Sequence, residues 1–253
     1  MKNVLEVPVR GLGGFFAMTL DAFRYTFSRP VQWKEFIEQA WFIARVSMLP
    51  TILVAVPFTV LVSFTLNILL REIGASDLSG AGAAFGTISQ VGPMVTVLVV
   101  AGAGATAICA DLGARTIREE IAAMEVLGID PIKRLVIPRM WASMLVAMLL
   151  NAMVSTIGIL GGFLFSVYLQ DVNPGAFVNG IPLLTGLTDV VMSEVRAGAF
   201  GLIAGLVACY MGLSVKGGPK SVGDAVNQTV VYAFMALFAV NVILTAVGVK
   251  IAS

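Results

Sequence analysis

The sequence predicts an all-α integral membrane protein with an N-terminal interfacial helix, five transmembrane helices and a short cytoplasmic helix between the second and third crossings. Hydrophobic residues make up 58% of the 253 residues and charged residues only 12%, against about 25% charged residues in an ordinary soluble domain. The charges are clustered, so that long stretches contain none. Backbone amides in lipid must be hydrogen-bonded within their own segment, and these stretches lack the alternation of barrel strands, which leaves helices.

Five charge-free runs predict the five crossings, because each helical passage through the hydrocarbon core needs about 20 apolar residues. The runs are Val46–Leu70, Leu78–Ala110, Met140–Gln170, Ala197–Val215 and Ala225–Val249. The chain accordingly divides into a cytoplasmic and interfacial part, residues 1–45, and a five-helix transmembrane domain, residues 46–253. That domain contains a cytoplasmic loop at residues 111–139.

The positive charges predict the orientation of the chain. With five crossings, thirteen of the sixteen lysines and arginines fall on one side of the membrane, and only Arg71, Arg196 and Lys250 on the other. Because positive side chains accumulate in cytoplasmic loops, we expect a cytoplasmic N-terminus and an extracytoplasmic C-terminus. The net charge of +1 argues against nucleic acid as a partner.

The N-terminal part mixes aromatic rings with charges over residues 11–44, which is typical of a helix at the level of the lipid headgroups. Pro30 is expected to separate this interfacial helix from a lead-in to the first crossing. Further along the chain, Pro50, Pro57 and Pro93 predict bent transmembrane helices.

Glycines recur at a spacing of four in two of the predicted crossings, in Gly82-x-x-x-Gly86 and Gly201-x-x-x-Gly205. Such faces allow helices to approach closely, either inside one bundle or between two chains. Packing inside the bundle is the expected use of most of them.

The most informative segment is the connection between the second and third crossings. Thr116 followed by Glu119 fits a capping box and Gly128 fits a helix stop, so the sequence predicts a helix at Ile117–Leu127. Asp130, followed by a proline, predicts the N-cap of a second helix that returns to the membrane.

The predicted helix is amphipathic. Its apolar face consists of Ile117, Ile121 and Met124, and its other positions carry Arg118, Glu119, Glu120 and Glu125. Such a helix either binds a cytoplasmic partner or lies passively on the headgroups. The three glutamates weigh against an anionic membrane surface, which favours the partner.

This segment also resembles a known family. The string AGAGATAICADLGARTIREEIAAMEVLGIDPIKRLVIPR, residues 101–139, is similar to the signature of the MlaE/YrbE permeases, the membrane subunits of ABC-type lipid transporters that work with MCE proteins. A second string, VKGGPKSVGDAVNQTVV at residues 215–231, resembles the family at the connection before the last crossing. The resemblance covers essentially the whole chain. The string ICADLGARTIREE looks like the A-type YrbE subunit of actinobacterial MCE systems, and within that group it looks closest to the sterol-importing branch.

The resemblance implies a permease subunit of an ATP-driven MCE-type transporter that imports a hydrophobic lipid, such as a sterol, fatty acid or mycolic-type lipid, across the plasma (inner) membrane. It implies three protein partners: a second YrbE-type permease of the non-identical B type, a cytoplasmic ABC ATPase dimer and an MCE hexamer outside. ATP and Mg would be bound by the partner ATPase, so this chain would hold no cofactor, no metal and no catalytic residue.

The resemblance also assigns roles to residues. The short cytoplasmic helix is the coupling helix of the family, and the positions that would contact the ATPase are Ile117, Glu119, Glu120, Met124, Glu125 and Asp130. The substrate path would include Ser89, Gln90 and Pro93. Many family members have an Arg-Glu pair where this chain has Ser89 and Gln90, and an arginine is common at Ala103. A headgroup role of those charges does not carry over, which favours a neutral or different lipid.

Two other functional classes remain open. The absence of histidine removes Ser-His and Cys-His catalysis. An ion-coupled secondary transporter would place ionisable residues at mid-membrane, whereas Asp111, Asp189 and Glu194 are expected at membrane ends, solvated at the interface. A non-transporting assembly scaffold is the third class. The acidic cytoplasmic helix favours an ATPase-driven transporter over both.

Overall fold

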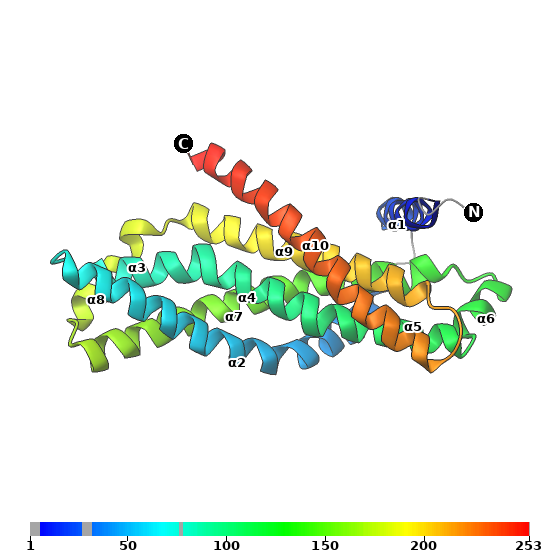
Figure 1. Ribbon diagram of the computed structural model, residues 1–253, viewed down its shortest axis with the longest axis horizontal. Helices are drawn as coiled ribbons and strands as arrows, with labels where there is room; N and C mark the ends of the chain where they lie inside the picture. Colours follow the sequence, from blue (N-terminus) through cyan, green and yellow to red (C-terminus); the bar gives the residue numbers. More distant parts are fainter. Residues whose placement is uncertain (1–5, 27–31, 76–77, 253) are drawn as a thin grey trace.

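The computed structural model describes residues 6–26, 32–75 and 78–252. Within this part of the chain, five helices are long and apolar enough to cross a membrane: Trp33–Glu72, Ser79–Ile117, Ile132–Gln170, Leu187–Leu213 and Pro219–Ala246. They run along the long axis of the molecule, with helix α6 (Glu120–Val126) at one end and α8 (Pro174–Leu184) at the other (Figure 1). The predicted all-α, five-crossing fold is confirmed.

The N-terminal helix and the first crossing are separate elements. Helix α1 (Glu6–Tyr25) lies crosswise to the bundle near its α6 end, where Figure 1 shows it end-on. Helix α2 (Trp33–Glu72) then runs for 40 residues without interruption through Pro50 and Pro57. The lead-in and the first crossing are therefore one helix. Pro30, expected to divide the two elements, lies outside the described residues.

The second crossing alternates between α-helix and the wider π-helix. Its segments are α3 (Ser79–Phe85), η2 (Gly86–Val91), α4 (Gly92–Val99), η3 (Val100–Gly104) and α5 (Ala105–Ile117), of which η2 and η3 are π-helical. Pro93, the second residue of α4, has no N–H and leaves a carbonyl in the preceding turn without its helical donor. A π-helical turn accommodates this defect, and such turns are frequent at functional sites.

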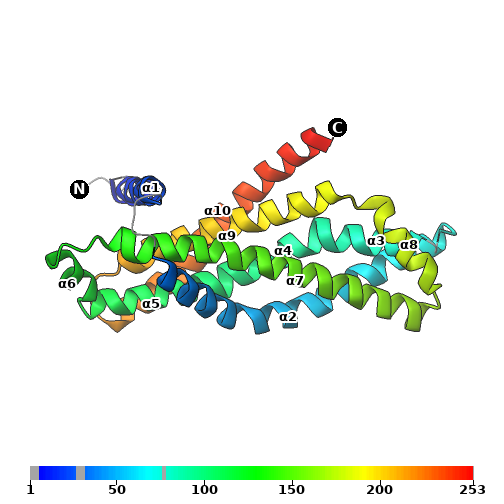
Figure 2. The ribbon, with the colours of Figure 1, turned by 180° about the vertical axis from the view of Figure 1, so that it is seen from behind.

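The third and fourth crossings form the centre of the bundle. Figure 2 shows α7 (Ile137–Gln170), which follows the π-helical turn η4 (Ile132–Val136), lying between α2 and α9 (Leu187–Leu213). At Gly201 of α9 a Cβ would collide with the carbonyl group of Ser143, whose hydroxyl donates to the Gly201 carbonyl at 2.8 Å. The glycine motif at Gly201 and Gly205 thus packs two helices inside the bundle, as expected.

The buried face of α2 is polar. Its buried polar residues recur about every four positions and are Gln39, Ser47, Thr51, Thr59, Ser63 and Asn67. This face packs against α7, where the Asn67 amide donates to the Ser166 hydroxyl at 2.7 Å. Exposed leucines and valines cover the opposite face of α2. Lipid tails are as apolar as leucine, so small and polar groups drive helix association in a membrane.

The last helix and the far end complete the fold. Helix α10 (Pro219–Ala252) begins near α6, packs against α5 and α9, and then diverges from the bundle towards the C-terminus (Figure 1). At the opposite end, α8 folds against α3, and the Phe177 ring meets the Phe163 ring of α7 edge-on, with ring centroids 5.4 Å apart. The α6 end and the α8 end are therefore closed by different short helices.

Candidate functional site

The connection between α5 and η4, residues 118–131, is a compact hairpin around α6, called here the α6 hairpin. Helix α5 continues to Ile117, and the chain then turns at Glu119, whose φ of 59° is left-handed. Helix α6 occupies Glu120–Val126, shorter than the predicted Ile117–Leu127. The predicted capping box is wrong, because the Thr116 hydroxyl instead donates to the carbonyls of Leu112, at 2.9 Å, and Gly212, at 3.2 Å.

Other local signals in the hairpin are confirmed. Gly128 ends the hairpin helix with a φ of 74°, and its N–H donates to the carbonyl of Glu125 at 3.0 Å. The Asp130 carboxylate accepts a hydrogen bond from the N–H of Ile132 at 2.9 Å, as a cap should. Ile121 and Met124 of α6 and Ile117 at the end of α5 pack against the main core, so the predicted apolar residues face inward, on two helices rather than one.

The charged positions of the hairpin face outward. Glu119 and Glu125 are exposed, and Glu120 forms an ion pair with Arg118 at 3.1 Å that is open to solvent. Such an exposed pair contributes at most about 1 kcal/mol to stability. These glutamates are therefore available to a partner at little cost to the fold.

The hairpin also presents an apolar tip that the sequence analysis missed. The exposed fractions are 88% for Val126 and 75% for Leu127, and Ile129 is also exposed. The available signal was the apolar run between Glu125 and Asp130, which carries more apolar residues than the inner face of α6 uses. Two large apolar side chains at the tip of a polar hairpin are typical of a contact site for another protein.

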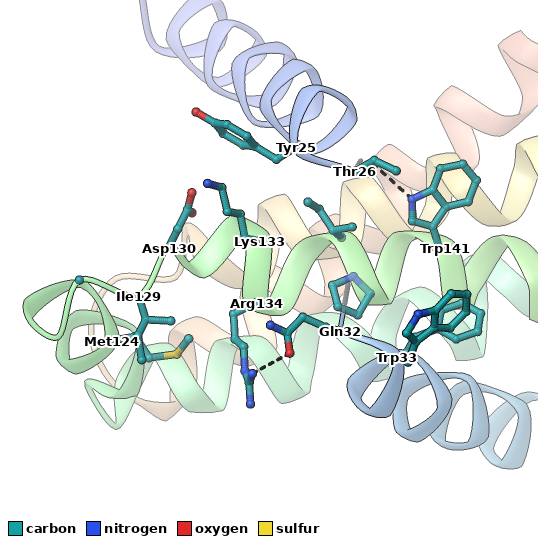
Figure 3. A pocket seen from close by; sticks show the side chains of 14 residues that line it. Tyr25, Thr26, Gln32, Trp33, Met124, Ile129, Asp130, Lys133, Arg134 and Trp141 are labelled. Atoms are coloured by element: carbon teal, nitrogen blue, oxygen red, sulfur yellow. Dashed lines mark hydrogen bonds between the residues drawn. The ribbon is translucent and has the colours of Figure 1, made fainter. Parts of the chain in front are cut away.

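A cavity of about 890 Å³ lies beneath the hairpin. Its lining residues come from the end of α1, the start of α2, the hairpin and the start of α7, and include Met124, Ile129 and Asp130 (Figure 3). Arg134 donates to Gln32 at 2.7 Å across it, and Lys133 sits 4.2 Å from the centre of the Tyr25 ring. The π-helical turn η4, which follows the hairpin, thus meets the N-terminal segments through polar contacts around an open space.

A buried charge cluster joins the base of the hairpin to three crossings. Arg139 of α7 is completely buried and contacts Asp111 of α5 at 2.6 Å and Glu35 of α2 at 3.9 Å. Asp111 also pairs with Arg115 at 3.3 Å. Asp111 was expected to be solvated at the interface; its side chain is partly exposed, and its carboxylate also neutralises a buried arginine. A displacement of the hairpin base would therefore move α2, α5 and α7 together, because this cluster joins them.

The predicted path residues lie in a different region. Ser89 and Gln90 belong to the π-helical turn η2, and Pro93 to the first turn of α4. Pro93 is buried, Ser89 is half-buried and Gln90 is exposed on the surface of the bundle. The structure therefore groups these three residues with each other and separates them from the hairpin by η3 and α5.

Comparison with known proteins identifies the family. The profile of the family described as Permease MlaE matches residues 36–247. A probable ABC transporter permease protein of Synechocystis is 29% identical over 96% of this chain and 93% of its own length. A probable ABC transporter permease protein of Rickettsia felis is 32% identical over 64% of this chain and 62% of its own length.

A third relative carries a more specific name. The intermembrane phospholipid transport system permease protein MlaE of Haemophilus influenzae is 26% identical over 71% of this chain and 69% of its own length. The family profile covers all five crossings and the α6 hairpin, the regions that carried the resemblance in the sequence. The chain therefore belongs to the MlaE family of ABC transporter permeases.

Proposed function

We propose that this chain is the membrane-spanning half of an ATP-driven MCE-type lipid importer in the plasma (inner) membrane, and that it is the A-type YrbE subunit of an actinobacterial system. Its lipid would be a sterol, a fatty acid or a mycolic-type lipid. Relatives with lipid-related names, the H. influenzae phospholipid transport permease and the Arabidopsis protein TRIGALACTOSYLDIACYLGLYCEROL 1, support transport of a lipid.

The observation that carries the proposal is the α6 hairpin with its exposed apolar tip. An ABC permease has no ATPase of its own, so force must enter through a contact with another chain. Val126 and Leu127 supply apolar contact area, and the neighbouring Glu119 and Glu125 supply charge that an anionic lipid surface would repel. The Arg139 cluster then ties the hairpin base to α2, α5 and α7.

The proposed lipid path runs past Ser89, Gln90 and Pro93. The alternation of α- and π-helical turns along the second crossing provides a segment that can change its winding without losing its backbone hydrogen bonds. A push on α5 would reach η2 through the continuous helix. The second permease, proposed to be of the B type, would complete the path, and an MCE hexamer would receive or deliver lipid at the α8 end.

The proposed orientation places the α6 end and α1 in the cytoplasm. Helix α1 and the hairpin lie at the same end of the bundle, and α10 leads the C-terminus away from that end (Figure 1). This arrangement agrees with an odd number of crossings and with the predicted charge distribution.

Copurification of the ATPase tests the proposal. The tagged chain is coexpressed with the candidate ATPase, and the recovered complex is quantified for Val126→Asp and Leu127→Asp. A charge at an apolar contact should lower ATPase recovery about tenfold or more and abolish lipid uptake. Leu184→Asp is the matched control, because Leu184 is an exposed apolar residue of α8 at the opposite end. Equal ATPase recovery for all variants would contradict the proposal.

The same experiment separates the alternatives. An ion-coupled secondary transporter would keep lipid uptake without any ATPase. An assembly scaffold would bind the ATPase, but uptake by the assembled complex would not follow ATP hydrolysis.

A further inference from the structure

A carboxyl group lies within the membrane-spanning bundle. Asn151 is the central residue of the 39-residue span Ile132–Gln170. Its amide nitrogen donates to the Glu194 carboxyl at 3.0 Å and to the Ser193 hydroxyl at 2.9 Å. Glu194 was expected near a membrane end, because it precedes the apolar run that begins at Ala197. In the structure α9 begins at Leu187, so Glu194 lies inside the fourth span rather than before it.

The Asn151 amide also connects Glu194 to the proposed lipid path. Asn151 is only 1% exposed, and its Oδ1 has no hydrogen-bond partner in the described part of the chain. A Cβ built on Gly92 would lie 2.8 Å from that oxygen, so the amide fits against the glycine backbone. Gly92 stands between Gln90 and Pro93. Glu194 is therefore held at the same level as the π-helical turn η2, and α9 packs against both η2 and α4.

Apolar residues lie beside Glu194 on the exposed side of α9, and Arg196 follows two positions further along the same helix. Glu194 is half-buried, and its neighbours Val191 and Val195 on α9 are exposed, as is Met94 on the adjoining α4. Among the residues that the structure describes, Asn151 is the one hydrogen-bond donor to the carboxyl group. Ionisable side chains within transmembrane segments are rare, because burying a charge in a bilayer is unfavourable, and such residues mark substrate pathways.

We propose that Glu194, positioned by Asn151, is a binding residue for the polar end of the transported lipid and accepts a hydrogen bond from a hydroxyl group there. The exposed valines and Met94 would contact the apolar body of the lipid. A lipid that ends in phosphate or carboxylate would be repelled by the like charge at this point. This inference rests on the proposed transport function and adds a specificity-determining residue to it.

Photocrosslinking in membranes that contain the assembled complex tests the inference. The probes are a photoreactive long-chain alcohol and its methyl ether, which differ by one hydrogen-bond donor. The wild type should capture the alcohol about tenfold more than the ether, the ratio expected for one hydrogen bond to a charged group. Glu194→Met should bring the ratio to about one. Glu194→Gln keeps an acceptor for Asn151 and should retain part of the preference.

The control is Asp189→Asn on the same helix. The Asp189 carboxylate accepts from the N–H of Gly186 at 2.9 Å at the beginning of α9, and its substitution should leave the capture ratio unchanged. A ratio near one in the wild type, or an unchanged ratio in Glu194→Met, would overturn the inference. If the Glu194→Met variant no longer copurifies with the second permease while its alcohol-to-ether capture ratio is unchanged, the carboxyl group would be assigned to permease pairing instead. ATPase recovery from the same membranes reports separately on the proposed function.

Discussion

Removal of Asp111 should destabilise the bundle strongly, whereas removal of Asp111 together with Arg139 should not. Arg139 is 0% exposed, and its closest acidic contact is Asp111 at 2.6 Å, since Glu35 at 3.9 Å is beyond hydrogen-bond distance. Breaking a buried pair by removing one partner costs about 3–5 kcal/mol. Because the Asp111 side chain is 30% exposed, water screens part of this interaction, and we expect about 3 kcal/mol for Asp111→Leu.

The double variant Asp111→Leu with Arg139→Met replaces the pair by apolar side chains of similar size. It should lie within about 1 kcal/mol of the wild type, because the desolvation cost of the buried charge disappears with the charge. Equilibrium unfolding in SDS–detergent mixed micelles, followed by tryptophan fluorescence, measures the free energy of unfolding. Arg115→Met is the control, since it removes a more exposed pair at 3.3 Å and should cost less than about 1 kcal/mol. A double variant as unstable as Asp111→Leu would refute the reasoning.

Two further substitutions follow from the same structure. Glu120→Lys should change the free energy of unfolding by less than about 1 kcal/mol, because the ion pair of Glu120 with Arg118 is exposed. The same variant should reduce the recovery of the ATPase. Unchanged ATPase recovery would show that Glu120 is not part of the contact. Gly201→Leu should destabilise the bundle by about 3 kcal/mol or more, since even a Cβ there meets the Ser143 backbone. Wild-type stability of Gly201→Leu in the same unfolding assay would show that α7 and α9 do not pack as described.

The number and order of the crossings could be predicted because bilayer thickness imposes a length on every apolar run. The ends of the crossings could not, since the charge-free criterion treats every charge as a boundary. Arg139 lies inside the third span, where Asp111 neutralises it. Glu194 lies inside the fourth, where Asn151 binds it. Both partners are distant in sequence, so neither crossing could be extended without the tertiary structure.

In the hairpin, too, some features could be predicted from the sequence and others could not. Its apolar face and its Gly128 stop depend on spacing and backbone conformation alone, and both are confirmed. The predicted capping box depended on Thr116 being the N-cap residue that precedes a helix. The hydroxyl instead bonds Gly212 of α9, which allows α5 to continue past it, and the turn falls at Glu119. A left-handed glutamate costs about 1 kcal/mol or more and has no signature in the sequence.

The polar face of α2 reverses the usual relation between hydrophobicity and burial. In water, the alternation of Ser47, Thr51, Thr59 and Ser63 with leucines would place the hydroxyls outside. In lipid the same helix buries them against α7, because leucine gains nothing from leaving the hydrocarbon. The pattern identifies the packing face correctly only after the membrane has been recognised as the solvent.

The accessibility of the hairpin tip tests the central claim most directly. Leu127→Cys introduces an exposed thiol, whereas Cys109 and Cys209 are buried, so a membrane-impermeant maleimide reports on position 127. The thiol should be labelled in inside-out vesicles but not from outside intact cells, and coexpression of the ATPase should slow labelling about tenfold or more. Labelling from outside the cell, or an equal rate with and without the ATPase, would contradict a cytoplasmic hairpin that binds the ATPase.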